Sequence, residues 1–452
     1  MPPRPEPRPV RVSMVSLGCP KNLVDSEKAL GTLASAGLVL APDPADSDVA
    51  VVTTCGFIDP AKEESIATIL EMVALKEKGA IRGVVVAGCL VERFAEDLRK
   101  EIPEVDAFVP FKDYPRLARI CQEVLGEAVP EGADWRGDLA SVDRVPLTPP
   151  HMAYVKVSEG CDNPCSFCTI PAIRGRHVSR PFREIVDETA RLASEGVREV
   201  VLIGQDTTFY GYEREKRFLL ADLLRALDRV EGLRWIRLMY AYPAYVKDDL
   251  LDALRDCRKV VPYLDMPIQH VADGALRRMM RPLGGKGTRA LLERIRERVP
   301  GIALRTTFIV GSPGETGEEV EELVRFVRDF RFHHLGVFVY SREEDTPMGK
   351  RTALVPRREQ NRRRRLVMEA QQRVAFERNR DLAAAWTEVE ALVEAKAAGG
   401  RWHGRTAWDA PSIDGTVRLP DRPGLRPGAM GRVRITAARG YDLEAEWAGE
   451  PS

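Results

Sequence analysis

The sequence contains no long apolar run, little cysteine and no excess of charge of either sign. None of its apolar stretches reaches the roughly 18 residues that a membrane-spanning helix needs. Its opening, MPPRPEPRPV, lacks the apolar core of a secretory signal. Only 8 of 452 residues are cysteine, too few for a disulfide scaffold. Lysine plus arginine number 68, as do aspartate plus glutamate, so net charge does not indicate a polyanionic ligand. We expect a cytoplasmic protein without a membrane partner, in which clustered cysteines indicate metal or redox chemistry.

Three of the cysteines lie close together in the segment EGCDNPCSFCTIP, residues 159–171. Cys161, Cys165 and Cys168 have the spacing C-x3-C-x2-C. An odd number of thiols does not suit disulfides, and a structural zinc site needs a fourth ligand, for which His177 is the candidate at an unusually long spacing. Three thiolates can instead hold three irons of a 4Fe–4S cube and leave the fourth iron open to a small molecule. The spacing therefore favours an iron–sulfur cluster over zinc.

Short apolar runs alternate with helical patterns in the first part of the chain. The runs RVSMVSL, DVAVVTT and GVVVAG are typical of buried parallel strands, and helices are expected after them, the first near residues 25–36. This pattern predicts a doubly wound α/β domain. Cys19, Cys55 and Cys89 each follow one of these strands, and the carboxyl ends of parallel strands meet at one edge of a sheet. The three thiols should therefore converge, although burial in the core is the simpler interpretation of any one of them.

The strand–helix rhythm resumes after a segment rich in Gly, Pro and Asp. Six strand candidates follow: AYVKVSE, EVVLIG, WIRLMY, VVPYLDM, ALRTTFIV and LGVFVY. They predict a partial, open (β/α)6 TIM-like barrel with its active site at the carboxyl ends of the strands, where the C-x3-C-x2-C loop lies. A long Arg-rich helix from residue 357 to about 384 precedes five short strands, which predict a small OB-like β-barrel.

These patterns predict an α/β multidomain protein. The expected parts are a disordered tail (1–8), the N-terminal α/β domain (9–125), a linker (126–146), the partial barrel with the long helix (147–384) and the terminal β-barrel (385–452).

The cysteine loop on a partial barrel resembles the radical S-adenosylmethionine (SAM) superfamily. The resemblance implies that the open iron of a 4Fe–4S cluster chelates SAM, and that one electron cleaves SAM to a 5′-deoxyadenosyl radical. It also implies SAM contacts after the second and fifth strands. Gly204, Gln205 and Asp206 would bind the SAM ammonium, and Gly311 and Gly314 would let the backbone approach the adenine. Ordinary turns are the alternative interpretation of both segments.

Along essentially its whole length the chain resembles the methylthiotransferases, whose terminal barrel is the TRAM domain. The resemblance implies that Cys19, Cys55 and Cys89 hold a second 4Fe–4S cluster, which carries the sulfur to be donated. One SAM would methylate that sulfur and another would supply the radical. The implied cofactors are thus two 4Fe–4S clusters and SAM, and the implied partners include an electron donor and a sulfur source whose identities the sequence does not give. The terminal barrel contains no cysteine, so we expect it to recognise the acceptor.

Four segments resemble the RimO type of this family: SLGCPKNLVDSE, EGCDNPCSFC, GQDTTFYG and LDMPIQH. That type modifies the β-carbon of an aspartate in ribosomal protein S twelve, which implies this protein or the small ribosomal subunit as partner. Residues 385–452 contain 9 Lys/Arg and 10 Asp/Glu, a net charge of −1 that suits a basic protein better than RNA phosphates. The arginines of residues 362–365 favour RNA unless they pair with nearby glutamates. The alternatives are a tRNA adenosine methylthiotransferase and a zinc-bound RNA-binding module without catalysis.

Several other polar or cysteine residues have a structural interpretation beside a functional one. His270 could line the substrate pocket or form a core hydrogen bond. Asp25 and Glu27 are expected to be helix-start residues rather than catalytic ones. Four further residues are expected to be structural: His333, His334, Cys121 and Cys257.

Overall fold

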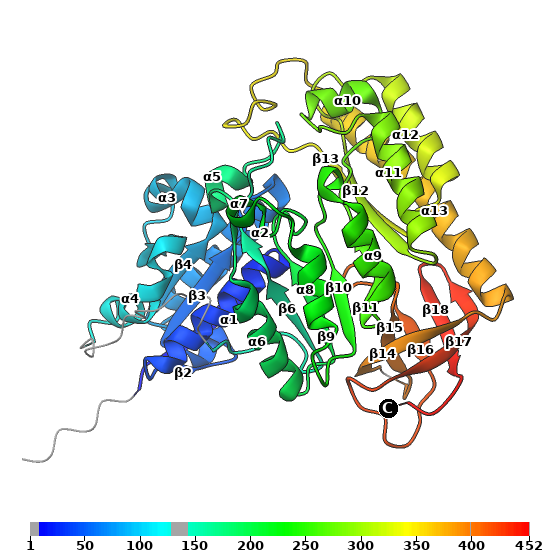
Figure 1. Cartoon of the computed structure of the whole chain (residues 1–452). Coiled ribbons are helices and arrows are strands. Elements are labelled where there is room, and N and C mark those ends of the chain that lie inside the picture. Colours follow the sequence, from blue (N-terminus) through cyan, green and yellow to red (C-terminus); the bar gives the residue numbers. More distant parts are fainter. Residues whose placement is uncertain (1–8, 128–142, 398, 452) are drawn as a thin grey trace, which may run out of the picture. The chain divides into compact units, whose positions relative to one another are not determined.

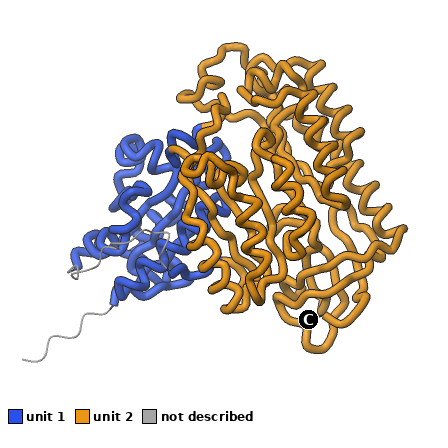
Figure 2. Tube along the Cα trace, viewed as in Figure 1, with its two compact units in different colours: residues 1–147, 169–175 blue, residues 148–168, 176–452 orange. Residues whose placement is uncertain are grey.

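The computed structural model describes residues 9–127, 143–397 and 399–451, so the expected tail and most of the expected linker lie outside the described residues. The chain divides into two compact units. Unit 1 comprises residues 1–147 and 169–175, and unit 2 comprises residues 148–168 and 176–452 (Figure 2). Among the helices of the described residues, none combines the length and the apolar character needed to cross a membrane.

Unit 1 contains a five-stranded parallel sheet with the strand order β2-β1-β3-β4-β5 (Figure 1). Its strands are β1 (Arg11–Ser16), β2 (Val39–Leu40), β3 (Val49–Thr54), β4 (Gly83–Gly88) and β5 (Ala107–Val109). Its helices are α1 (Pro20–Ser35), α2 (Asp59–Glu77), α3 (Cys89–Glu101), α4 (Leu117–Val124) and α5 (Ile170–Arg174), with short 3-10 helices at Pro44–Asp46 and Phe111–Arg116. Alternate residues of β3 enter two different apolar cores, Val49 and Val51 on one face and Ala50 and Val52 on the other. Both faces of the sheet are therefore covered, and the predicted doubly wound fold is confirmed.

Helix α1 begins earlier than the sequence predicted. Its first residue is Pro20, whereas the pattern placed the start near Asp25. Proline suits the first helical position because its fixed φ is already helical and its missing N–H would have no partner there. The interpretation of Asp25 and Glu27 as helix-start residues is therefore wrong, since both lie inside the helix.

Unit 2 is built on a six-stranded parallel sheet with the order β13-β12-β11-β10-β9-β6. Its strands are β6 (Met152–Lys156), β9 (Glu199–Ile203), β10 (Trp235–Leu238), β11 (Val260–Asp265), β12 (Ala303–Val310) and β13 (His334–Val339). The helices between and after them are α6 (Phe182–Ser194), α7 (Tyr212–Glu215), α8 (Leu220–Leu227), α9 (Asp248–Asp256), α10 (Asp273–Arg278), α11 (Gly285–Arg298), α12 (Gly317–Phe330) and α13 (Arg357–Ala384), with a 3-10 turn at Pro243–Tyr245. A small antiparallel pair, β7 (Ser158–Glu159) and β8 (Val178–Ser179), flanks the cysteine loop. The first and last strands of the sheet do not pair with each other, so the predicted open partial barrel is confirmed.

The terminal strands of unit 2 form a closed five-stranded barrel in the order β14-β15-β16-β18-β17, as predicted. They are β14 (Glu388–Lys396), β15 (Trp402–Thr406), β16 (Val417–Leu419), β17 (Met430–Arg439) and β18 (Asp442–Trp447). This terminal barrel packs on the amino ends of the parallel strands (Figure 1). Glu199, Trp235 and His334 are the first residues of their strands, and each contacts it. The carboxyl ends of the strands, and the cysteine loop with them, lie at the opposite end of the sheet.

Buried ion pairs hold the terminal barrel on the sheet. The fully buried Glu199 carboxylate accepts hydrogen bonds from Arg405 Nη2 at 2.5 Å and from Arg237 Nε at 2.8 Å. Arg405 Nε also donates to Glu394 Oε1 at 2.5 Å, and Arg237 Nη1 donates to the carbonyl oxygen of Ala407 at 3.0 Å. Burial alone would raise the pKa of Glu199, but the two arginines lower it below its ordinary value. Without the barrel, Glu199 would lose Arg405 and Arg237 would lose the carbonyl oxygen of Ala407. The barrel therefore contributes to the stability of unit 2.

Arg405→Met should therefore lower the free energy of unfolding by about 3 kcal/mol, because breaking a buried ion pair leaves an uncompensated charge. Chemical denaturation of the full chain, followed by circular dichroism, measures this change. Arg418→Met is the matched control, since Arg418 lies in the same barrel and is exposed, and it should change stability by less than about 0.5 kcal/mol. Equal stability of the two variants would contradict the anchoring role of Arg405.

Candidate active site

Three loops of unit 1 bring Cys19, Cys55 and Cys89 to the carboxyl edge of the sheet. Cys19 is the N-cap of α1 after β1, Cys55 directly follows β3, and Cys89 is the first residue of α3 after β4. The pKa of the Cys55 thiol is raised to about 11, mainly by burial and to a smaller extent by the charges of the neighbouring Cys19 and Cys89. The predicted convergence of the three loops is thus seen in the structure.

Two glycines permit this close approach. A Cβ on Gly18, whose φ is +91°, would lie 2.8 Å from Cys55 Cβ. A Cβ on Gly88, whose φ is +100°, would lie 2.7 Å from the carbonyl oxygen of Thr54. Both contacts are closer than real Cβ atoms come, and the backbone angles favour glycine. The glycine before Cys19 and the one before Cys89 therefore allow the loops to carry their thiols to one place.

A second set of thiols lies in unit 2, on the loop that follows β6 and β7. Cys161 is buried, and Asn163 Nδ2 lies 3.3 Å from its Sγ and 2.7 Å from Asp206 Oδ2. Burial raises the pKa of the Cys161 thiol to about 11. Asn163 thus connects the cysteine loop to the segment after β9.

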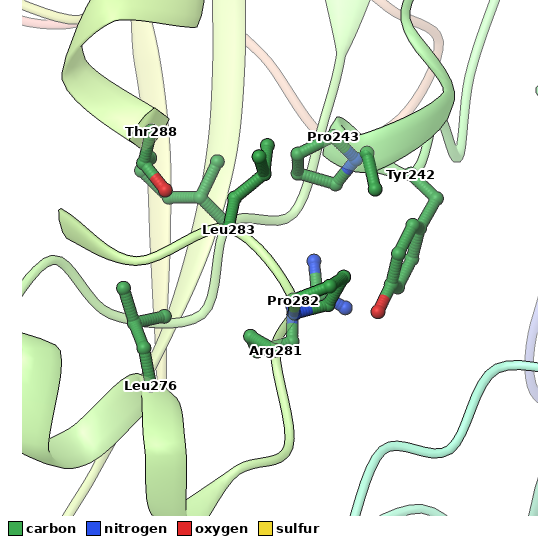
Figure 3. A pocket seen from close by; sticks show the side chains of 9 residues that line it. Tyr242, Pro243, Leu276, Arg281, Pro282, Leu283 and Thr288 are labelled. Carbon is green, nitrogen blue, oxygen red and sulfur yellow. The ribbon is translucent and has the colours of Figure 1, made fainter. Parts of the chain in front are cut away.

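Arg281 and Tyr242 flank the second cysteine of this loop. Arg281 Nη1 lies 3.4 Å from Cys165 Sγ, and the Tyr242 hydroxyl lies 4.0 Å from the same sulfur. The Arg281 guanidinium also lies over the Tyr242 ring, 4.1 Å from its centroid (Figure 3). Arg281 therefore places positive charge beside a thiol that the sequence predicts to bind iron.

The pocket in Figure 3 is lined in part by Tyr242, Leu276, Arg281 and Thr288. It holds about 10 Å³, roughly the space that one water needs. It is too small for SAM, and we assign no ligand to it.

The donor set of both cysteine groups suits an iron–sulfur cluster better than a single metal ion. All eight cysteines are free thiols. Within the described residues, no three His, Cys, Asp or Glu side chains are arranged to hold one ion. Thiolates on a 4Fe–4S cube each bind a different iron, so they stand apart from one another. Burial raises the pKa of the Cys55, Cys89 and Cys161 thiols, so their thiolates need neighbouring positive charge, which bound iron would supply.

His177, the candidate fourth zinc ligand, is engaged elsewhere in unit 2. Its Nε2 lies 3.3 Å from Ser179 Oγ and 3.8 Å from Glu213 Oε2, and its ring meets the Phe209 ring edge-on. Burial lowers the pKa of His177. These contacts give the side chain a structural role, and the zinc interpretation has no support.

The segment Gly204–Asp206 braces the cysteine loop. A Cβ on Gly204 would lie 2.7 Å from Ser158 Oγ, and Gln205 Nε2 donates to Glu159 Oε1 at 2.6 Å. The buried Asp206 accepts hydrogen bonds from the backbone and the hydroxyl of Thr208 as well as from Asn163. Its pKa is raised by burial. The predicted contact of this segment with the SAM ammonium stays a prediction.

The two glycines after β12, Gly311 and Gly314, each lie close to another side chain of the protein. A Cβ on Gly311 would lie 2.5 Å from Gln360 Cγ of α13, and a Cβ on Gly314 would lie 3.5 Å from Arg278 Cδ. Both residues have positive φ, +76° and +77°. At Gly311 the space for a Cβ is already occupied by Gln360. The predicted approach of adenine to the backbone stays a prediction for both glycines.

His270 has the core role that was one of its two interpretations. Its ring is fully buried, Nδ1 accepts a hydrogen bond from the backbone of Ala272 at 3.0 Å, and Nε2 lies 3.5 Å from Glu315 Oε1. Glu315 also accepts hydrogen bonds from the Gly311 backbone at 2.6 Å and from Arg363 at 2.7 Å. This buried group fixes the loop after β12 against α13.

Comparisons with known proteins define the class of this site. Residues 155–327 match the Radical SAM superfamily, residues 11–110 the uncharacterized protein family UPF0004, and residues 387–448 the TRAM domain. A solved structure of the radical S-adenosylmethionine methyltransferase TsrM from Kitasatospora setae, with tryptophan and a SAM analogue bound, has a TM-score of 0.56 at 16% identity. The match covers 87% of this chain and 79% of that one, and shows likeness of fold. The fold and the cysteine loop thus define a radical SAM protein.

Curated relatives place the chain more narrowly. It is 46% identical over 455 residues to the ribosomal protein uS12 methylthiotransferase RimO of Symbiobacterium thermophilum, covering 98% of this chain and 92% of the relative. It is 43% identical over 439 residues to the protein of the same name from Aquifex aeolicus, covering 96% of each. The chain belongs to the RimO family of methylthiotransferases. The cofactors of a protein of this class are SAM and 4Fe–4S clusters, and two cysteine sets correspond to two clusters.

Proposed function

We propose that this chain adds a methylthio group to the β-carbon of an aspartate in ribosomal protein uS12, the protein that the names of its relatives give as substrate. The observation that carries the proposal is the presence of two separate sets of three thiols, each able to hold a cluster with one open iron. One set would hold the cluster needed for SAM cleavage and the other the cluster needed for sulfur delivery, so a single set would not suffice for both tasks.

Each set has its own role in this account. When bound, the clusters and SAM supply hydrogen abstraction and sulfur transfer. Cys161, Cys165 and Cys168 would hold the cluster that binds SAM, with Asn163 and Arg281 orienting two of these thiols. The set in unit 1, Cys19, Cys55 and Cys89, would hold the cluster that carries sulfur.

Gln205 is the best placed of the five proposed SAM-binding residues. Its Oε1 is buried and has no hydrogen-bond partner among the described residues, while its Nε2 is held by Glu159. A buried acceptor without a partner costs free energy unless a ligand supplies a donor. The SAM ammonium is such a donor, so we assign this contact to Gln205.

Two features favour a protein acceptor over the tRNA alternative. The terminal barrel has a net charge of −1. In the Arg-rich helix, Arg362 and Arg363 both donate to the Glu359 carboxylate at 2.7–2.9 Å, and these hydrogen bonds lower the pKa of Glu359 to about 2. Arg362 and Arg363 thus pair with a nearby glutamate, which supports a structural role for them over RNA binding. Because small ribosomal subunits lie in the cytoplasm, a ribosomal acceptor supports our proposal that the protein acts there.

The acceptor residue should lie on an exposed loop. Hydrogen abstraction requires the target carbon to approach the radical carbon to about 3–3.5 Å. A carbon within a folded helix or strand could not reach a radical formed at the end of a barrel.

The reconstituted protein, given SAM and reductant, should therefore methylthiolate uS12 in intact small subunits and leave tRNA unchanged. Mass spectrometry of both substrates after the same incubation decides between the acceptors. The expected product has one SCH3 in place of one hydrogen on an aspartate. Methylthioadenosine in the tRNA together with unmodified uS12 would overturn the proposal.

A further inference from the structure

One arginine of unit 1 faces the thiols of the unit-1 cysteine set. Arg174 is the last residue of α5, and its Nη2 lies 3.3 Å from Cys89 Sγ. Its side chain is only 4% exposed. A buried guanidinium keeps its charge, and the field of that charge is weakly screened where water is excluded.

Three further contacts fix the direction of this guanidinium. Nη1 donates to Asp25 Oδ2 at 2.5 Å, Nη2 lies 3.4 Å from Asn22 Oδ1, and the Phe111 ring lies under the guanidinium with its centroid 3.9 Å away. Asp25 and Asn22 belong to α1, the helix that begins directly after Cys19. The planar fork of arginine can bridge a carboxylate and a sulfur at once, which a lysine ammonium does less well.

Arg174 lies in a short segment of unit 1 that interrupts the sequence of unit 2. Residues on either side belong to unit 2, but residues 169–175 pack with unit 1 (Figure 2). Arg174 therefore follows the last cysteine of the unit-2 set by only six residues, while its side chain contacts a cysteine of the other set.

We propose that Arg174 is a positioning residue for the second cluster. Its guanidinium holds Cys89 in the ligand geometry and offsets negative charge of the thiolate-bound cluster, while Asp25 holds the guanidinium. The inference rests on the proposed function, because it takes Cys19, Cys55 and Cys89 as cluster ligands. Partners that orient metal ligands typically contribute about 10- to 100-fold to metal affinity. Loss of a neighbouring positive charge also makes a cluster harder to reduce.

The test uses the full chain with Cys161, Cys165 and Cys168 replaced by serine, so that only the second cluster remains. Arg174→Gln should speed loss of iron to a chelator about tenfold and shift the midpoint potential, followed by EPR, to a more negative value. Arg174→Lys keeps the charge and should lie between Arg174→Gln and the parent. Asp25→Asn should change both quantities in the same direction as Arg174→Gln. Arg116→Gln, the same change at an exposed arginine of unit 1, should leave both unchanged.

The possible outcomes are distinguishable. Iron loss and potential in Arg174→Gln that equal those of the parent would overturn the proposal. If Arg174→Gln does not fold, the lysine and Asp25→Asn variants carry the test, and parent-like values in both would overturn it. If the parent itself binds no iron, the assignment of the cluster ligands fails instead. A tRNA acceptor would leave these measurements unaffected.

Discussion

Replacing Cys161, Cys165 and Cys168 together with serine is expected to remove about half of the iron and to abolish reductive cleavage of SAM. The reason is that two 4Fe–4S clusters contain equal numbers of iron atoms, and only the cluster on the barrel loop is expected to bind SAM. The loop lies at the carboxyl end of β6 and is braced by Asn163 and Asp206. Iron and sulfide assays measure the first effect, and chromatography of 5′-deoxyadenosine measures the second.

Cys257→Ser is the matched control for this experiment. Cys257 is in the same unit, at the end of α9, and packs in the apolar core. Its replacement should leave iron content and SAM cleavage unchanged. Full iron content in the triple variant would contradict the assignment of the barrel loop as a cluster site.

Replacing Cys19, Cys55 and Cys89 with serine should have the complementary effect. About half of the iron should again be lost, but reductive cleavage of SAM should continue because the barrel loop is intact. Transfer of the methylthio group should stop, since the sulfur-carrying cluster is absent. The same assays, together with mass spectrometry of the acceptor, separate these two outcomes.

Cys121→Ser serves as the control in unit 1, because Cys121 is fully buried in the apolar core of α4. Burial raises the pKa of that thiol to about 12, and no other thiol contributes to the shift. Retention of all iron by the triple variant would show that the second cluster does not exist.

The sequence predicted the convergence of the unit-1 cysteines because parallel strands end at a common edge, so three short strands each followed by cysteine must place them together. It also predicted the partial barrel from the alternation of strand and helix patterns, the long helix from an Arg-rich run, and the terminal barrel from five short strands. The apolar pattern predicts the start of α1 too late, because the pattern begins inside the helix and the start signal is the proline at position 20.

Arg174, Asn163 and Arg281 were not predicted from the sequence. Nothing in the periodicity indicates that residues 169–175 leave the barrel and pack with the other unit. The RGR run at 174–176 was the available signal, but basic residues in a loop are usually solvated. The Glu199–Arg405 pair joins residues 206 positions apart and depends on how two barrels pack, which local sequence patterns do not encode.

The proposed function can be tested in cells by mass spectrometry of ribosomal proteins and tRNA from a strain that lacks this protein and from one that contains it. Without the protein, we expect one aspartate of uS12 to lack its methylthio group and tRNA to be unchanged. The wild-type chain should restore the modification, and the serine variants at either cysteine set should not. Unchanged uS12 with loss of methylthioadenosine from tRNA would contradict the proposed function.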